Sequence, residues 1–382
     1  MGQATQSIRP VQRIPLGWKR WLGCTALGWA SATCRGMRPR REKDAVAPIF
    51  ILEPYGMGDV ISLEPLVREL RRQDREVRLG ANAAWHELFP DHTNMRWVNT
   101  RIPWTSYDDG RKYGLREFFS DEFRRCRAEL RGACNGAIGL DTRGDPRSVM
   151  LLWRAGCREV YSLSHYLGSN FRNVRSAAQA VEFVEDIHRW QMNLRFLAPL
   201  GLSTTPGIAP PEFPHLAPKR TVTPKRLGFI PIAPWTGKSW GRGKWQELQL
   251  QLVARGFETV GLCGPQQTAA AQLELGTSVP VQECTALAAW AQELTACRLV
   301  VSVDTGPMHL ADALRVPTLA LFGQGKLPLW SPNGPRSAVI HHQEAPDFKL
   351  CHPVEENAWR GRIAMERISV AEVADAVQIL TR

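Results

Sequence analysis

The stretch from Leu299 to Gln324 constrains the fold more than any other, because it places a tight polar turn and a short helix between two buried strands. Leu299–Val303 is a short apolar run rich in β-branched residues, which is typical of a buried parallel strand. In the turn that follows, Thr305 is a candidate N-cap and Pro307 suits a first helical turn. Thr318–Phe322 is predicted to be the next strand. A helix N-terminus beyond the carboxyl end of a strand is where α/β proteins hold phosphate.

A second unit of strand, turn and helix begins at Ile49–Leu52. Gly56 and Gly58 in its turn allow the backbone to approach a ligand closely. The spacing is not that of a dinucleotide fingerprint, because no glycine follows at Ser62. Asp59 has two readings, a first-turn acid that suits the helix dipole or a carboxylate at the edge of a cleft that accepts a proton.

Strands alternate with helices along the rest of the chain, which predicts parallel sheets in two Rossmann-like α/β domains that face each other across a cleft. We predict a first domain over residues 48–205, a proline-rich linker over 206–225 and a second domain over 226–365. The valine-rich pattern of residues 366–382 predicts a last amphipathic helix.

Basic residues occur where an anionic ligand would use them. Lys238 follows the first predicted strand of the second domain, so its loop and the Asp304 turn should open on the same sheet edge. Arg124 and Arg125 lie on a predicted helix over residues 117–130. Such a run is typical of a solvated helix face, and it also suits a phosphorylated acceptor if it lines the cleft.

Composition excludes several classes of protein. Most of the net charge of +11 lies before Pro48, so the body of the chain gives no general argument for nucleic acid. The nine cysteines are scattered, which indicates a reduced compartment and no zinc site. The basic leader, residues 1–47, has an uncharged stretch too short to span a bilayer. It has three readings: an interfacial anchor, a weak secretory signal, or a flexible extension or early start, which we favour.

Four blocks of the chain resemble glycosyltransferase family 9, the ADP-heptose:lipopolysaccharide heptosyltransferase family. They are IFILEPYGMGDVISLEPLVREL (49–70), AIGLDTRGDPRSVMLLWRAGCREV (137–160), GFIPIAPWTGKSWGRGKWQEL (228–248) and VVSVDTGPMHLADALRVPTLALFG (300–323). The likeness spreads over roughly residues 48–382 and leaves out the leader.

The resemblance implies a GT-B fold, in which the last helix crosses back to the first domain. It also implies an inverting glycosyltransferase that moves a heptose-like sugar from a nucleotide sugar, ADP-heptose, to a lipopolysaccharide-core or related cell-envelope glycan. Asp59 would be the general base, and Lys238, helped by Thr236, would bind the diphosphate. The donor-binding turn would be formed by Asp304, Thr305, Gly306 and His309, and the acceptor-side candidates are Gly58, Asp141, Arg143, Arg124 and Arg125.

The resemblance further implies that the partners are the nucleotide-sugar donor and a lipid-linked or phosphorylated acceptor. No obligatory metal or other cofactor is expected. We expect a cytoplasmic location, with peripheral contact at the inner membrane face left open.

Two departures from the family pattern bear on the ligands. Gln266-Gln267-Thr268 stands where acidic residues often hold the nucleoside, and Tyr55 and Trp235 are bulky beside the two ligand loops. Two other classes stay open: an isomerase or hydrolase that acts on the nucleotide sugar alone, and a non-catalytic envelope-assembly protein. A nicotinamide oxidoreductase is disfavoured because the dinucleotide fingerprint is absent.

Overall fold

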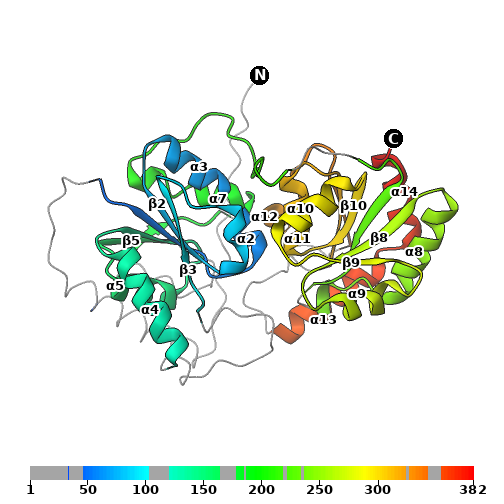
Figure 1. Ribbon diagram of the computed structural model, residues 1–382, viewed down its shortest axis with the longest axis horizontal. Helices are drawn as coiled ribbons and strands as arrows, with labels where there is room; N and C mark the ends of the chain where they lie inside the picture. Colours follow the sequence, from blue (N-terminus) through cyan, green and yellow to red (C-terminus); the bar gives the residue numbers. More distant parts are fainter. Residues whose placement is uncertain are drawn as a thin grey trace.

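The protein forms two lobes that lie side by side, each built on a twisted sheet with helices around it (Figure 1). The computed structural model describes residues 33, 46–102, 120–163, 178–184, 186–217, 222–233, 236–323, 327–342 and 354–382, and of residues 146, 236 and 354–360 it describes the backbone alone. Almost all of the leader lies outside the described residues, as does Trp235. None of the helices among the described residues is both long and apolar enough to cross a lipid bilayer.

The first lobe contains a six-stranded parallel sheet in the order β3-β2-β1-β4-β5-β6. Its central strands β1 and β4 are short apolar runs that are buried at every position, as strands covered on both faces must be. The strands are β1 (Ile49–Leu52), β2 (Val77–Ala81), β3 (Met95–Asn99), β4 (Ile138–Asp141), β5 (Glu159–Leu163) and β6 (Gln179–Val181).

The helix that we expected to continue from the Asp59 turn is broken into two. Ser62 Oγ donates to the carbonyl of Asp59 at 2.6 Å, and Pro65 has no N–H to offer the preceding turn. The helix therefore ends at Ile61 and a new one starts at Glu64. The helices of this lobe are α2 (Met57–Ile61), α3 (Glu64–Arg72), η1 (Ala83–Leu88), α4 (Asp121–Cys134), α5 (Pro146–Ala155), α7 (Arg189–Leu194) and η3 (Ala198–Leu200).

The second lobe repeats this architecture with a parallel sheet in the order β12-β11-β10-β7-β8-β9. Its strands are β7 (Arg226–Ile230), β8 (Glu258–Cys263), β9 (Val281–Glu283), β10 (Leu299–Val303), β11 (Thr318–Phe322) and β12 (Ala338–His341). Its helices are η4 (Thr236–Lys238), α8 (Arg242–Ala254), α9 (Thr268–Leu275), α10 (Leu287–Ala296), α11 (Gly306–Ala313), α12 (Leu327–Trp330), α13 (Val354–Arg367) and α14 (Val370–Leu380).

Both sheets run outward in opposite directions from a central pair of strands, β1 with β4 and β7 with β10. In such doubly wound sheets, ligands bind beyond the carboxyl ends of the strands where the direction reverses. The two Rossmann-like domains predicted from the alternation of strands and helices are confirmed.

The expected crossing of the last helix to the first domain is wrong for α14. This helix packs on α8 and β10 of the second lobe. Val370, Val373 and Val377 form one face of α14 and join Trp245 and Leu299 in the core beside the second sheet. The apolar stripe was predicted correctly, but the sequence did not show which sheet it covers.

Residues 206–217 of the linker lie against the first domain, whereas Thr223 already bonds to Ala296 of the second domain. Phe213 is buried and meets Phe89 edge to face, with ring centroids 5.6 Å apart. Arg68 Nη2 donates to the carbonyl of Ala209 at 2.7 Å. The first half of the proline-rich linker is thus held in place by contacts with the first domain.

An ion network joins α3, the linker and the end of α11. Arg68 Nη1 lies 3.5 Å from Glu64 and 2.8 Å from Glu212, and Arg315 Nη2 lies 3.5 Å from Glu212. Because α3 belongs to the first lobe and Arg315 to the second, these contacts tie the two lobes together.

The Glu64 carboxyl in this network should make stability fall as the pH rises. Burial raises the pKa of Glu64 to about 7, although Arg68 and the N–H of Glu212 act in the opposite direction. An unfolded glutamate titrates near about 4.3. The folded state therefore holds this proton more tightly, and the stabilisation is full below the unfolded pKa and lost as the pH rises through the folded one.

We therefore expect Glu64→Gln to raise the unfolding temperature relative to the wild type more at about pH 8 than at about pH 5. Glu69→Gln is the matched control. Burial acts to raise the pKa of Glu69, but hydrogen bonds from Arg72 and Thr205 outweigh it and lower the pKa. Glu69 is thus ionised at both pH values, and its substitution should destabilise equally at both. An equal effect of Glu64→Gln at the two pH values would contradict the assignment.

Candidate active site

The polar turns singled out in the sequence meet at the seam between the two lobes, where α2 and α11 are in contact (Figure 1). A Cβ added to Gly58 would lie 2.6 Å from Cδ2 of His309, and one added to Gly306 would lie 3.0 Å from Cβ of Met57. These two glycines allow the first turns of both helices to touch. The two domains therefore face each other, as predicted, and they touch at this contact between α2 and α11.

A small pocket opens beside the contact. It draws its lining from both lobes, because Gly58, Ser62 and His188 face Asp312, His309 and Trp330 across it. Asp312 fixes one wall, since its carboxylate accepts from the N–H groups of Asn333 and Gly334, each at 2.7 Å. His188, Trp330 and Asn333 were not singled out from the sequence as site residues.

Lys238 and Asp304 lie together, as the order of the strands predicted. Lys238 Nζ is 2.7 Å from Oδ2 of Asp304, and Nε2 of His309 is 4.0 Å from Oδ1 of the same carboxylate. An ammonium and a carboxylate in contact fix each other's position at the end of β10. Asp304 thus orients the turn, and Lys238 stands beside it with about a quarter of its side chain exposed, 23%.

The turn Asp304–Gly306, which we call the donor turn, leads into α11. Thr305 is the N-cap residue, as predicted, but its side chain makes no capping hydrogen bond. Among the described residues, no group accepts a hydrogen bond from the N–H of Thr305 or Gly306. Free N–H groups at a helix N-terminus next to a lysine favour an anion. The side chain of Thr236 lies outside the described part of the chain.

Two imidazole rings near the seam are held neutral. Burial lowers the pKa of His309, and it lowers the pKa of His188 to about 3 with a smaller contribution from His309. His188 Nε2 lies 2.9 Å from the carbonyl of Ser331, and the ring of His309 lies 5.5 Å from that of Trp330. Both ring nitrogens of His188 are thus used within the chain, since Nδ1 also accepts from the N–H of Trp190 at 3.4 Å.

Asp59 lies in the first turn of α2, directly beyond β1. Its Oδ2 is 2.7 Å from Nη2 of Arg143, whereas its Oδ1 is buried and accepts no hydrogen bond from any described residue. A buried acceptor without a partner is rare and calls for a functional explanation. Asp59 is also close enough to act electrostatically on His309 across the seam. A carboxylate with one fixed and one open oxygen can accept a proton from a bound hydroxyl.

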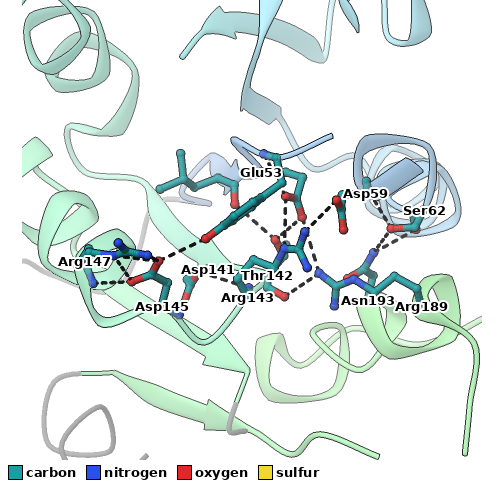
Figure 2. Close-up of polar contacts among 12 residues, drawn as sticks. Glu53, Asp59, Ser62, Asp141, Thr142, Arg143, Asp145, Arg147, Arg189 and Asn193 are labelled. Carbon is teal, nitrogen blue, oxygen red and sulfur yellow. Dashed lines mark hydrogen bonds and ion pairs between the residues drawn. The ribbon is translucent and has the colours of Figure 1, made fainter. Parts of the chain in front are cut away.

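Arg143 belongs to a buried group of charges behind Asp59, shown in Figure 2. We call Glu53, Asp59, Thr142, Arg143 and Arg189 the base cluster. Glu53 and Arg189 are fully buried. They follow β1 and open α7, respectively, and were not singled out from the sequence. The only signal there was an acid that ends an apolar strand, IFILE.

The remaining acceptor-side candidates occupy different places. Asp141 is buried and builds the loop after β4, because its carboxylate accepts from Ser162 Oγ at 2.7 Å and from the N–H of Asp145 at 2.8 Å. Burial, with a contribution from Asp145, raises its pKa to about 7. Arg124 and Arg125 are exposed on α4, where Arg124 pairs with Asp121. No contact within the described residues joins either arginine to the base cluster, so their role stays a prediction.

An acidic residue from another strand lies near the Gly264-Pro265 turn after β8, although no acidic residue follows that turn directly in the sequence. Glu283 ends β9, and its Oε2 accepts from Thr268 Oγ1 at 2.7 Å. Gln267 Oε1 accepts from the N–H of Gly264 at 3.1 Å and so closes the turn. Within the described residues, no group of three or more His, Cys, Asp or Glu side chains is arranged to hold a metal ion.

Sequence comparison agrees with the resemblance seen in the motifs. Residues 187–357 match the model of glycosyltransferase family 9 (heptosyltransferase). Lipopolysaccharide heptosyltransferase 1 of Pseudomonas aeruginosa is 38% identical over 103 residues, which are 25% of this chain and 28% of that protein. Lipopolysaccharide heptosyltransferase 3 of Escherichia coli is 29% identical over 205 residues, 50% of this chain and 59% of that protein. The matches thus span less than two thirds of either relative.

Solved structures confirm the GT-B fold. The E. coli heptosyltransferase WaaC with ADP matches with a TM-score of 0.65 at 17% identity, over 87% of this chain and 99% of that one. The E. coli ADP-heptose lps heptosyltransferase II matches with a TM-score of 0.60 at 15% identity, over 87% of this chain and 98% of that one. The fold expected from the motifs, two facing Rossmann-like domains, is therefore confirmed.

Proposed function

We propose that this chain, which carries the sequence pattern of glycosyltransferase family 9 over residues 187–357, is an inverting glycosyltransferase. Its donor is a nucleotide sugar, ADP-heptose, and its acceptor is a hydroxyl of a lipopolysaccharide core or a related cell-envelope glycan. The names of the similar proteins support this choice of sugar and acceptor.

One observation carries the proposal: the open Oδ1 of Asp59 lies in the first helical turn that touches the donor turn. A proton acceptor and an anion site then meet from opposite domains. Glycosyl transfer needs this pair, because the hydroxyl must lose a proton while the leaving diphosphate keeps a negative charge.

The reaction follows from these charges. Asp59 Oδ1 takes the proton of the acceptor hydroxyl as its oxygen forms a bond to the anomeric carbon. The bond from that carbon to the diphosphate oxygen breaks, and the nucleoside diphosphate leaves with the electron pair. Lys238 and the N–H groups of Thr305 and Gly306 stabilise its charge. With a lysine and a helix N-terminus in this role, we propose that the reaction needs no obligatory metal.

A donor screen tests the choice of ligand. The unfolding temperature of the full chain is measured with ADP-, GDP-, UDP- and dTDP-sugars, and the ADP-sugar is expected to raise it most. A larger rise with another nucleotide would contradict the proposed donor. Incubation of the donor without acceptor separates transfer from isomerisation or hydrolysis, since rapid conversion of the donor alone would favour those reactions.

Lys238→Ala is expected to weaken binding of the nucleotide sugar by about 10- to 100-fold, because a charge-assisted hydrogen bond contributes roughly 1.5–3 kcal/mol. Calorimetry of donor binding measures the change. Lys225→Ala is the matched control, since Lys225 is an exposed lysine at the opposite end of β7. Equal affinities of the two variants would remove Lys238 from the site.

A further inference from the structure

We propose that Glu53 and Arg189 are positioning residues for the base: together they fix Arg143, and Arg143 fixes Asp59 so that Oδ1 alone is free to take the proton. The inference rests on the proposed function and adds to it a pair of residues that touch neither donor nor acceptor.

The contacts form a chain from the core to the site (Figure 2). Arg189 Nη2 lies 3.5 Å from Oε2 of Glu53 and donates to the carbonyl of Thr142 at 2.7 Å. Thr142 Oγ1 donates to Oε2 of Glu53 at 2.6 Å. Glu53 Oε1 lies 3.8 Å from Nε of Arg143, whose Nη2 lies 2.7 Å from Asp59 Oδ2. Three chain segments that are distant in sequence therefore converge on one carboxylate.

The burial of these charges argues against a role in surface solubility. Glu53 and Arg189 have no exposed surface, and Arg143 is 6% exposed. An ion pair at such depth is weak evidence for stability, because apolar residues of the same volume often do as well. A connected polar network instead restricts the movement of its members, and this one ends at Asp59.

Arg143 is held from a third side as well. Its guanidinium carbon lies 4.1 Å from the ring centroid of Tyr55, whose hydroxyl donates to Asp145 Oδ2 at 3.2 Å. The bulky Tyr55, which was noted as unusual beside this loop, thus forms a lid over Arg143. The guanidinium is thus in contact with Glu53 and with the Tyr55 ring, while its Nη2 lies against Asp59.

The proton affinity of Asp59 depends on the charges around it. These are Arg143 from the loop after β4, Glu53 from the end of β1 and, across the seam, His309 on α11. Burial and the charge of Asp59 raise the pKa of Glu53, and Arg143 and Arg189 act in the opposite direction. Because His309 is neutral, Arg143 and an ionised Glu53 set the field at Asp59 with opposite signs. Removal of the two charges should therefore move the acidic limb of the pH–rate profile in opposite directions, to higher pH without the Arg143 cation and to lower pH without the Glu53 anion.

The test measures transfer kinetics of the full chain across pH, together with donor affinity. Glu53→Gln is expected to lower kcat by roughly 10- to 100-fold, the range for groups that orient a functional residue from behind, with donor affinity unchanged. The acidic limb of the kcat/KM profile should move to lower pH. In Arg143→Met the same limb should move to higher pH by about one unit or more. The Arg143 variant carries the test alone if Glu53→Gln does not fold.

Glu69→Gln is the matched control, because Glu69 is an equally buried, arginine-paired glutamate in the same domain. It should lower the unfolding temperature and leave kcat and the acidic limb as in the wild type. If Glu53→Gln behaves like Glu69→Gln, or if both site variants shift the limb in the same direction, the positioning role is overturned while the proposed function stands. If the wild type transfers no sugar from any donor, both fall together.

Discussion

Replacing Asp59 by Asn should lower kcat by about 10²–10⁴-fold, the usual effect of losing a general base. The amide occupies the volume of the carboxylate but cannot accept the proton of the acceptor hydroxyl. Affinity for the nucleotide sugar should stay within about twofold, because the groups proposed to bind diphosphate lie on the other domain. Steady-state transfer kinetics and donor calorimetry on the same preparation measure both quantities.

Asp121→Asn provides the control for this substitution. Asp121 is an exposed acid in the first turn of α4 and makes the same change of charge in the same domain. Its kcat should equal that of the wild type. Wild-type turnover in Asp59→Asn would show that another group takes the proton, and an equal loss in both variants would point to a general charge effect.

Replacing Arg189 by Met should lower the free energy of unfolding by about 3–5 kcal/mol, because it leaves the buried Glu53 with one arginine partner fewer. The substitution also removes the donor to the Thr142 carbonyl, which is a buried hydrogen bond of 2.7 Å. Urea denaturation of the full chain, followed by tryptophan fluorescence, measures the loss.

Two further variants make this result specific. Arg72→Met removes an arginine that is half-exposed and paired with Glu69, so we expect a loss of at most about 1 kcal/mol. The double variant Arg189→Met with Glu53→Leu also removes the carboxylate that the single variant leaves short of a partner, and much of the stability should return. If Arg189→Met and Arg72→Met lowered the free energy of unfolding equally, the buried Glu53 carboxylate would not depend on Arg189 as its charge partner.

The strands that carry the site could be predicted from the sequence, because each is a short apolar run ended by polar or glycine-containing turns. The predicted bounds of β1, β10 and β11 agree with the structure. The meeting of Lys238 with Asp304 followed from the same pattern, since it requires only that two neighbouring parallel strands end at one edge. Local signals and the rules of parallel sheets were sufficient for this half of the site.

The base cluster could not be predicted, because its contacts join residues from distant segments. Nothing near Glu53 in sequence indicates that Arg189 will lie against it. The short edge strands β6 and β9 have three residues each, too few for a periodic pattern. The packing position of α14 was predicted wrongly for a related reason. An amphipathic stripe shows that one face of a helix will be buried, but not against which core.

The measurement that tests the central claim most directly is the configuration of the transferred sugar at its anomeric carbon. A single displacement, with Asp59 activating the hydroxyl on one domain and the diphosphate held on the other, requires attack from the face opposite the leaving group. Proton NMR of the purified product should therefore show the anomeric configuration opposite to that of the donor. A product that keeps the configuration of the donor would contradict this two-sided site.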